Sequence, residues 1–185
     1  PNFDLRSIVE EVAHLVSLEL DFVPADGSAP SVALLWSLID DVTATWRGLI
    51  GALPDEAVRW QPAPQSHSIG AVLLHVADSD QYWVEEVALG RRRGPEALAR
   101  VHADRTDVWA GRWAPPPAMG LDDFYALHDE LRASHRAATA SLDPRQTFVF
   151  DDGTCTLAWI LKHLASHNAY HYGQVALLAH LWNAR

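Results

Sequence analysis

Apolar residues recur at helical spacing in four long stretches of the chain, and each stretch predicts an amphipathic helix. The stretches cover residues 34–53, 68–89, 122–142 and 156–182. Ser66 or Ser68 can cap the second helix, because a serine oxygen accepts a hydrogen bond from the first turn, and Gly90 ends it. Asp122 or Asp123 opens the third helix. The chain is therefore predicted to be mainly helical.

Four long helices with almost no strand signal predict an all-α fold, a four-helix bundle that forms one domain over residues 1–185. Residues 90–121 include a run of three prolines and are too many for a tight antiparallel turn. We expect a long crossover connection there, or the rim of an active site. Residues 147–153 predict at most a small β-turn or hairpin. Residues 5–16 predict an additional N-terminal helix, within an appendage assigned to residues 1–30.

The chain carries 24 Asp and Glu against 14 Lys and Arg, which gives a formal net charge of −10. This excess argues against nucleic acid or an anionic membrane as a partner. We interpret the basic run from Arg91 to Arg93 as a solvated helix end. No window reaches the roughly 18 uncharged apolar residues of a membrane span, and no stretch at the start has the pattern of a signal peptide. The single cysteine, Cys155, rules out an internal disulfide, so we expect a cytoplasmic protein.

Two histidines of the fourth helix, His167 and His171, lie four residues apart and therefore share a helix face. His163 lies on the same face one turn earlier. Projected at the helical period, this face also carries apolar residues, namely Ile160, Leu164, Leu178 and Leu181. An imidazole buried without hydrogen-bond partners costs about 1–3 kcal/mol. The pattern indicates inward-pointing histidines that need partners, and a metal ion is the simplest candidate.

A metal site in a bundle core needs a further ligand from a facing helix, and His75 in the second helix is the best candidate. His163 is its rival. Three successive i, i+4 positions extend about 12 Å along a helix, too far for both outer residues to reach one ion. Three neutral histidines with an open position are typical of a catalytic zinc site. Hydrogen-bonded core imidazoles or a surface pair remain the alternative interpretation.

Other residues offer weaker candidates for chemistry. Cys155, near a helix start, is either a nucleophile or a buried thiol, and the buried thiol is favoured because the sequence designates no base. Asp78, one turn after His75, either orients a ligand imidazole, acts as a base, or lies in solvent. Trp109 and Trp113 in the long connection can line the mouth of a pocket. Five further histidines are interpreted as surface or polar core residues: His67, His102, His128, His135 and His180.

Residues 60–83 include a Pro-x-Pro step followed by a segment that runs from Ser68 through His75 to Trp83, and residues 164–174 contain the pattern H-x-x-x-H-x-G-Q. The first segment is similar to the P-x-P…S-I-G-x-L-L-x-H-I-A-E-x-E-x-Y-W stretch of the DinB-like superfamily, and the second matches the H-x-x-x-H-x-G-Q ending of that family. Its four-helix metalloproteins include DinB proteins, bacillithiol S-transferases and mycothiol-dependent maleylpyruvate isomerases. Together with the helix pattern over residues 31–182, the likeness covers about four-fifths of the chain.

The resemblance implies that His75, His167 and His171 hold a divalent metal ion, with water completing its shell and His163 unliganded. Imidazole ligands suit several metals, and zinc or nickel is expected. A bound divalent ion lowers the pKa of a water or thiol ligand, so the expected function is a hydrolase or a thiol S-transferase, acting on a small molecule with a low-molecular-weight thiol as one possible cosubstrate. The alternative is a non-catalytic, metal-stabilised binding or stress-response module. A homodimer is expected, because the apolar face of the N-terminal helix must be buried, either within the chain or against a second subunit.

Overall fold

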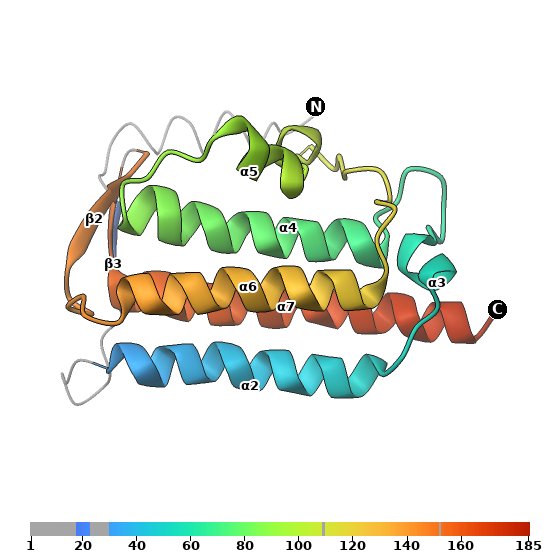
Figure 1. Ribbon diagram of the computed structural model, residues 1–185, viewed down its shortest axis with the longest axis horizontal. Helices are drawn as coiled ribbons and strands as arrows, with labels where there is room; N and C mark the ends of the chain where they lie inside the picture. Colours follow the sequence, from blue (N-terminus) through green and yellow to red (C-terminus); the bar gives the residue numbers. More distant parts are fainter. Residues whose placement is uncertain (1–17, 23–29, 109, 152) are drawn as a thin grey trace, which may run out of the picture.

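Four long helices form a bundle in the computed structural model, which describes residues 18–22, 30–108, 110–151 and 153–185 (Figure 1). They are α2 (Val32–Ile50), α4 (Ile69–Gln81), α6 (Leu121–Thr139) and α7 (Leu157–Asn183). Three short helical segments are α3 (Asp55–Arg59), α5 (Pro95–Arg100) and the 3₁₀ turn η2 (Ala103–Arg105). The predicted all-α fold is confirmed. The helix predicted over residues 5–16 lies outside the described residues.

Side-chain caps fix where the long helices begin. Ser68 Oγ accepts a hydrogen bond from Ala71 N over 3.1 Å, so the structure selects Ser68 rather than Ser66 as the cap of α4. Thr156 Oγ1 caps α7 in the same way. Helix α6 begins at Leu121, one residue before the first aspartate predicted to open it. These capping hydrogen bonds form within the first turn of each helix, so the residue types that make them can be recognised in the sequence.

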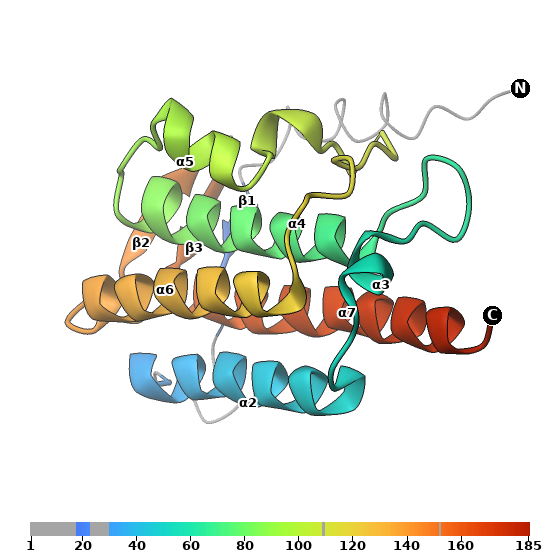
Figure 2. The same cartoon turned by 45° about the vertical axis from the view of Figure 1, so that its right-hand side comes forward.

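Helix α7 packs against α2 and α4, and α4 packs against α6. Figures 1 and 2 show α2 and α7 running in one direction and α4 and α6 in the other. Because α4 and α6 are parallel neighbours, the chain must return along the bundle between them, and the described residues of 89–120 make this crossover over α4. Gly70 lets the crossover approach closely, since a Cβ there would lie 3.0 Å from Pro117 Cδ. The predicted crossover therefore covers one side of α4.

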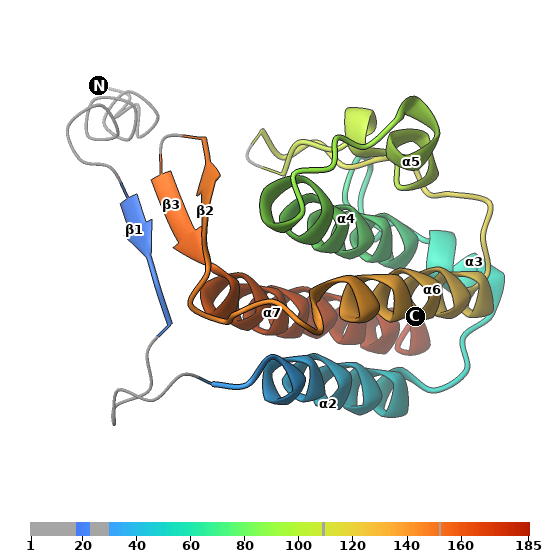
Figure 3. The same ribbon diagram turned by 60° about the vertical axis from the view of Figure 1, so that its left-hand side comes forward.

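A small sheet closes one end of the bundle (Figure 3). Strands β2 (Thr147–Phe150) and β3 (Gly153–Thr156) form the predicted hairpin, and β3 leads directly into α7. A third strand, β1 (Leu18–Leu20), pairs parallel with β3 in the order β1-β3-β2. Strand β1 was not predicted, because three residues are too few for a period-2 pattern to be recognised.

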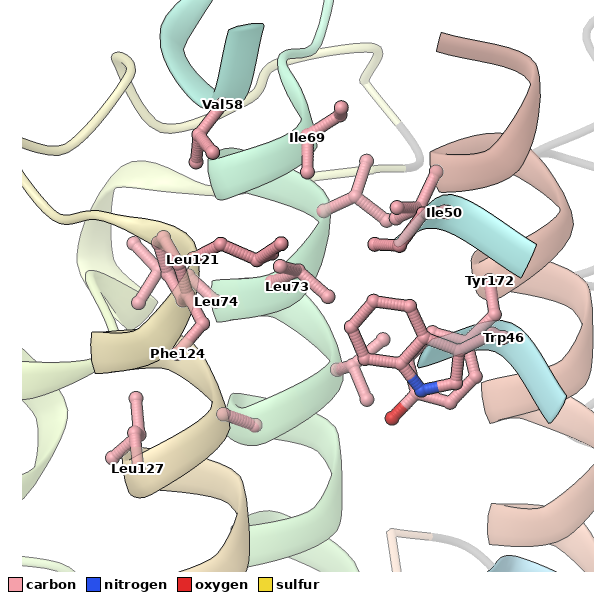
Figure 4. Close-up of a cluster of buried hydrophobic side chains, with 14 of the residues drawn as sticks. Trp46, Ile50, Val58, Ile69, Leu73, Leu74, Leu121, Phe124, Leu127 and Tyr172 are labelled. Atoms are coloured by element: carbon pink, nitrogen blue, oxygen red, sulfur yellow. The ribbon is translucent and has the colours of Figure 1, made fainter. Parts of the chain in front are cut away.

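Helix α4 is the most deeply buried element of the described structure. Of its 13 residues, only His75 and Asp78 are not buried. It continues into a π-helical segment, η1 (Tyr82–Ala88), which the sequence predicted only as the end of one long helix. The core around α4 includes Trp46 of α2 stacked on Tyr172 of α7, with ring centroids 4.4 Å apart (Figure 4).

Polar groups inside the bundle are connected to one another. His128 of α6 lies within 3.0 Å of the Leu73 carbonyl through Nε2 and within 3.4 Å of the Tyr172 hydroxyl through Nδ1. Arg132 in turn donates to Tyr172 Oη over 2.8 Å. Nε2 therefore donates to the carbonyl and Nδ1 accepts from the hydroxyl, which requires a neutral imidazole. Burial first, and then the charge of Arg132, lower the pKa of His128 to about 3.

His128 should make the folded state sensitive to acid. Its folded pKa of about 3 lies below the ordinary value of 6.5, so its contribution to the stability of the folded state is fully present above pH 6.5 and is lost as the pH falls towards 3. Over this window it adds a slope of about 1.4 kcal/mol per pH unit to the free energy of unfolding. Urea denaturation of wild type and His128→Gln, measured between pH 7.5 and 4, should show a shallower decline in the variant. Equal slopes would contradict the prediction.

Candidate metal centre

Three imidazoles from two helices meet beside the core. His75 comes from α4, and His167 and His171 come from successive turns of α7. The ring centroids are 5.1 Å apart for His75 and His167, 4.6 Å for His75 and His171, and 4.4 Å for His167 and His171. One nitrogen from each ring lies within 4.8 Å of the others. This spacing lets three ligand atoms surround one point.

Burial keeps the three imidazoles uncharged at neutral pH. Desolvation, and then the charge of the neighbouring His171, lower the pKa of His75 to about 4. Desolvation lowers the pKa of His167 to about 3, with further contributions from the other histidines. Desolvation also lowers the pKa of His171, and its hydrogen bond with Gln174 opposes this. A neutral imidazole has a lone pair to donate, which is the form that binds a metal.

Hydrogen bonds leave ligand atoms available in this cluster. The amide oxygen of Gln174 can only accept, so His171 Nδ1 donates to it over 2.9 Å and the lone pair of Nε2 stays free. Gln174 is itself held by a 3.3 Å hydrogen bond to Tyr170 Oη. His167 Nδ1 is buried without a hydrogen-bond partner among the described residues. The donor set and this unpartnered nitrogen fit a divalent metal ion.

His163 lies on the same side of α7 but belongs to a different cluster. Its ring stacks on Trp159 at 4.8 Å with an interplanar angle of 7°, and the edge of Trp83 approaches it at 5.1 Å. Its centroid is 5.6 Å from that of His167, and the group of converging nitrogens includes His75 instead. The structure agrees with the expectation that His163 and His171 do not both reach one ion, because it brings His75 of α4 to His167 and His171.

The crossover brings one aromatic side chain close to two of the three histidines. The ring of Trp113 lies 5.7 Å from that of His75, 6.3 Å from that of His171 and 4.9 Å from that of His67. Trp113 also lines a surface pocket between the crossover and the loop before α4, which agrees with the expectation that it lines the mouth of a pocket. Trp109 lies outside the described residues.

Among the described residues, the Asp78 carboxylate pairs with Arg93 and has no hydrogen bond to the three histidines. Arg93 Nη1 donates to Asp78 Oδ1 over 2.6 Å, and Arg93 Nε also pairs with Glu86. The Arg93 side chain is only 6% exposed. The interpretation of residues 91–93 as a solvated helix end is therefore wrong for Arg93, since its acidic partners come from the preceding helix and the sequence did not pair them.

Cys155 and two further histidines are buried as expected. Burial raises the pKa of the Cys155 thiol to about 11, so the favoured interpretation of a buried thiol holds and a reactive thiolate is not supported. His128 and His135 are buried polar residues of α6. The Nε2 atom of His135 lies 3.2 Å from Glu85 Oε1.

One detail of the predicted histidine face is wrong. Leu181 was placed on the inward face, but it is 44% exposed. The fully buried face of α7 carries Asn168 and Tyr172, which follow His167 and His171 by one residue each and so lie about 100° further round the helix. The three-histidine cluster therefore lies at the edge of the core, where His75 and His167 are half-buried.

Gln174 was not predicted as a partner of the site. Its signal in the sequence is the i, i+3 spacing from His171, which places the two side chains on neighbouring positions of one helix face. The buried polar residues of α4 were not predicted either, because their partners lie on helices distant in sequence.

Comparison with known proteins identifies the family. The family model of the DinB superfamily matches residues 38–175, which run from within α2 to within α7 and include all three histidines. The chain belongs to the DinB superfamily. It is also similar to the uncharacterized protein YkkA of Bacillus subtilis (strain 168), with 23% identity over 158 residues that cover 83% of this chain and 89% of that protein.

None of the helices in the described part of the chain is long and apolar enough to cross a bilayer.

Proposed function

We propose that His75, His167 and His171 bind one divalent metal ion, with zinc or nickel as the expected metal. The observation that carries the proposal is the convergence of three neutral imidazole nitrogens within 4.8 Å, from α4 and α7. Membership of the DinB superfamily supports it. Three protein ligands leave a coordination position open, which is typical of catalytic rather than structural sites.

The proposed activity is that of a metal-dependent hydrolase or thiol S-transferase acting on a small molecule in the cytoplasm. Such an ion, when bound, lowers the pKa of a water or thiol ligand and so supplies a nucleophile near neutral pH. The protein's own residues hold the ligand geometry. Gln174 fixes the orientation of the His171 ring, and the Trp113 ring restricts access of water from the crossover side.

Turnover must depend on the ion if this proposal is correct. A panel of low-molecular-weight thiols with electrophilic acceptors, and of esters and amides, is assayed with metal-free protein, with protein loaded with zinc or nickel, and with His75→Ala. Activity is expected only in loaded wild type. The alternative function is a non-catalytic binding or stress-response module that the ion stabilises. Stoichiometric metal with a raised melting temperature and no turnover on any substrate would favour this alternative.

Gln174→Leu should weaken metal binding without removing it. Loss of the amide oxygen leaves His171 free to rotate and to change its tautomer, and such partners typically contribute about 10–100-fold in affinity. Tyr170→Phe is the matched control, because it removes the hydroxyl that holds Gln174 and leaves the His171 hydrogen bond in place. Competition titration with a chelating dye gives both affinities. Equal affinities of Gln174→Leu and wild type would show that Gln174 does not support the site.

A further inference from the structure

Helix α4 supplies one of the three histidines, yet its hydrophobic residues alone cannot fix how it sits in the bundle. A surface helix has one apolar stripe, which determines its rotation. Nearly every position of α4 is buried, so apolar side chains point in all directions. Rotation or sliding of such a helix exchanges one apolar contact for another. Polar groups with unique partners are the means by which a buried helix acquires one register.

Asp80 is the buried charge of α4, and its partners lie on two other helices. Arg132 Nε of α6 is 3.7 Å from Asp80 Oδ2, and both side chains are 6% exposed. With its amide nitrogen towards α4, Asn168 of α7 donates to Asp80 Oδ1 over 3.2 Å, and its oxygen accepts from Arg132 Nη2 over 3.1 Å. Arg132 also donates to the Thr43 hydroxyl of α2. All four long helices therefore meet at this cluster.

The cluster and the histidines are close along the same two helices. His75 precedes Asp80 by five residues on α4, and Asn168 lies between His167 and His171 on α7. A slip of α4 by one residue changes its position by about 1.5 Å and its rotation by about 100°. Metal–ligand distances tolerate deviations of only about 0.2 Å. A single-residue slip would therefore remove His75 from the other two imidazoles.

We infer that Asp80, Asn168 and Arg132 are positioning residues that fix the register of α4 against α7 and thereby place His75 opposite His167 and His171. The inference deepens the proposed metal site and rests on it for its functional meaning. Burying these groups is costly: burial raises the pKa of the Asp80 carboxyl, and the Arg132 charge opposes that rise. A well-packed apolar cluster would often be at least as stable. The polar cluster is therefore better explained by the geometry that it specifies.

Asn168→Ser tests the inference, because it removes the link between α4 and α7 and leaves the Asp80–Arg132 pair in place. Thr139→Val is the matched control. Thr139 is also fully buried, and its hydroxyl accepts from Trp36 Nε1 over 3.0 Å, which joins α6 to α2 rather than α4 to α7. Both variants should lose some thermal stability. Only Asn168→Ser should disturb the three-histidine cluster.

Two measurements separate positioning from stability. In metal-free protein with labelled histidine, nuclear Overhauser effects between the His75 and His171 rings should be strong in wild type and Thr139→Val and weak in Asn168→Ser. In titrations with cobalt or zinc, Asn168→Ser should bind about 10–100-fold more weakly and change the visible cobalt spectrum, while Thr139→Val should match wild type.

The inference is overturned if Asn168→Ser lowers the melting temperature yet keeps the inter-ring effects and the metal affinity of wild type. If the proposed metal site itself is wrong, the experiment gives a different result. In that case wild type itself binds no metal, and the inter-ring effects in metal-free protein still decide whether Asn168 sets the register. If Asn168→Ser does not fold, Asp80→Asn, which keeps the size of the side chain, is measured in the same way.

Discussion

Replacing His75, His167 or His171 by alanine is expected to abolish stoichiometric metal binding. Each substitution removes one of only three protein ligands, and the remaining two nitrogens leave the ion mostly to water. The loss should therefore exceed the roughly 10–100-fold that a supporting residue contributes. Metal analysis after equilibrium dialysis against a fixed concentration of zinc or nickel gives the stoichiometry. Melting temperatures with and without metal should show stabilisation by the ion in wild type and none in these variants.

His163→Ala is the matched control for these three variants. His163 is also a half-buried histidine of α7, but it stacks on Trp159 and lies outside the group of converging nitrogens. It should therefore keep an occupied site at saturating metal. Retention of the ion by His75→Ala together with its loss from His163→Ala would show that the third ligand is assigned wrongly. Unchanged metal content in all four variants would remove the basis of the metalloenzyme proposal.

Arg132→Ala is expected to lower the free energy of unfolding by about 3–5 kcal/mol, because it leaves the Asp80 carboxylate buried without its positive partner. Urea denaturation at neutral pH measures the change. The structure offers an exposed comparison: Arg100 pairs with Glu130 at 2.6 Å, with side chains 45% and 63% exposed. Water solvates the remaining charge there, so Arg100→Ala should move the unfolding midpoint far less. Similar midpoints for the two variants would mean that the Asp80–Arg132 pair is not held in the core.

The sequence predicted the long helices well because their signals are local. Caps such as Ser68 and Thr156 bond within their own first turn, and the apolar residues of α2 and α6 mark one face. The π-helical segment η1 and the strand β1 were not predicted, because their backbone conformations depend on packing and pairing with distant parts of the chain. The helical pattern therefore gave the bundle but not the details of its ends.

The features of the candidate site that follow from local helix geometry were predictable, and its contacts between distant residues were not. The i, i+4 spacing of His167 and His171 shows their common face in the sequence alone. Helix geometry shows only that His163 and His171 cannot both reach one ion. The family resemblance leaves His163 unliganded, and the structure brings His75 to the pair. The partners of Asp78 and Asp80 could not be predicted, since Arg93 lies across a helix end and Arg132 lies on another helix. A carboxylate in a helical pattern does not show which guanidinium will bind it.

Strand β1 also has a consequence for the order of folding. Asp21, just after β1, accepts a hydrogen bond from Thr156 Oγ1 over 2.7 Å, and the two residues are 135 positions apart. Closing a flexible loop of that length costs about 4 kcal/mol in chain entropy, more than one such bond returns. Once the bundle has formed, the ends of this loop are already near each other. We therefore expect β1 to dock last during folding and its amide hydrogens to exchange with solvent before those of α4.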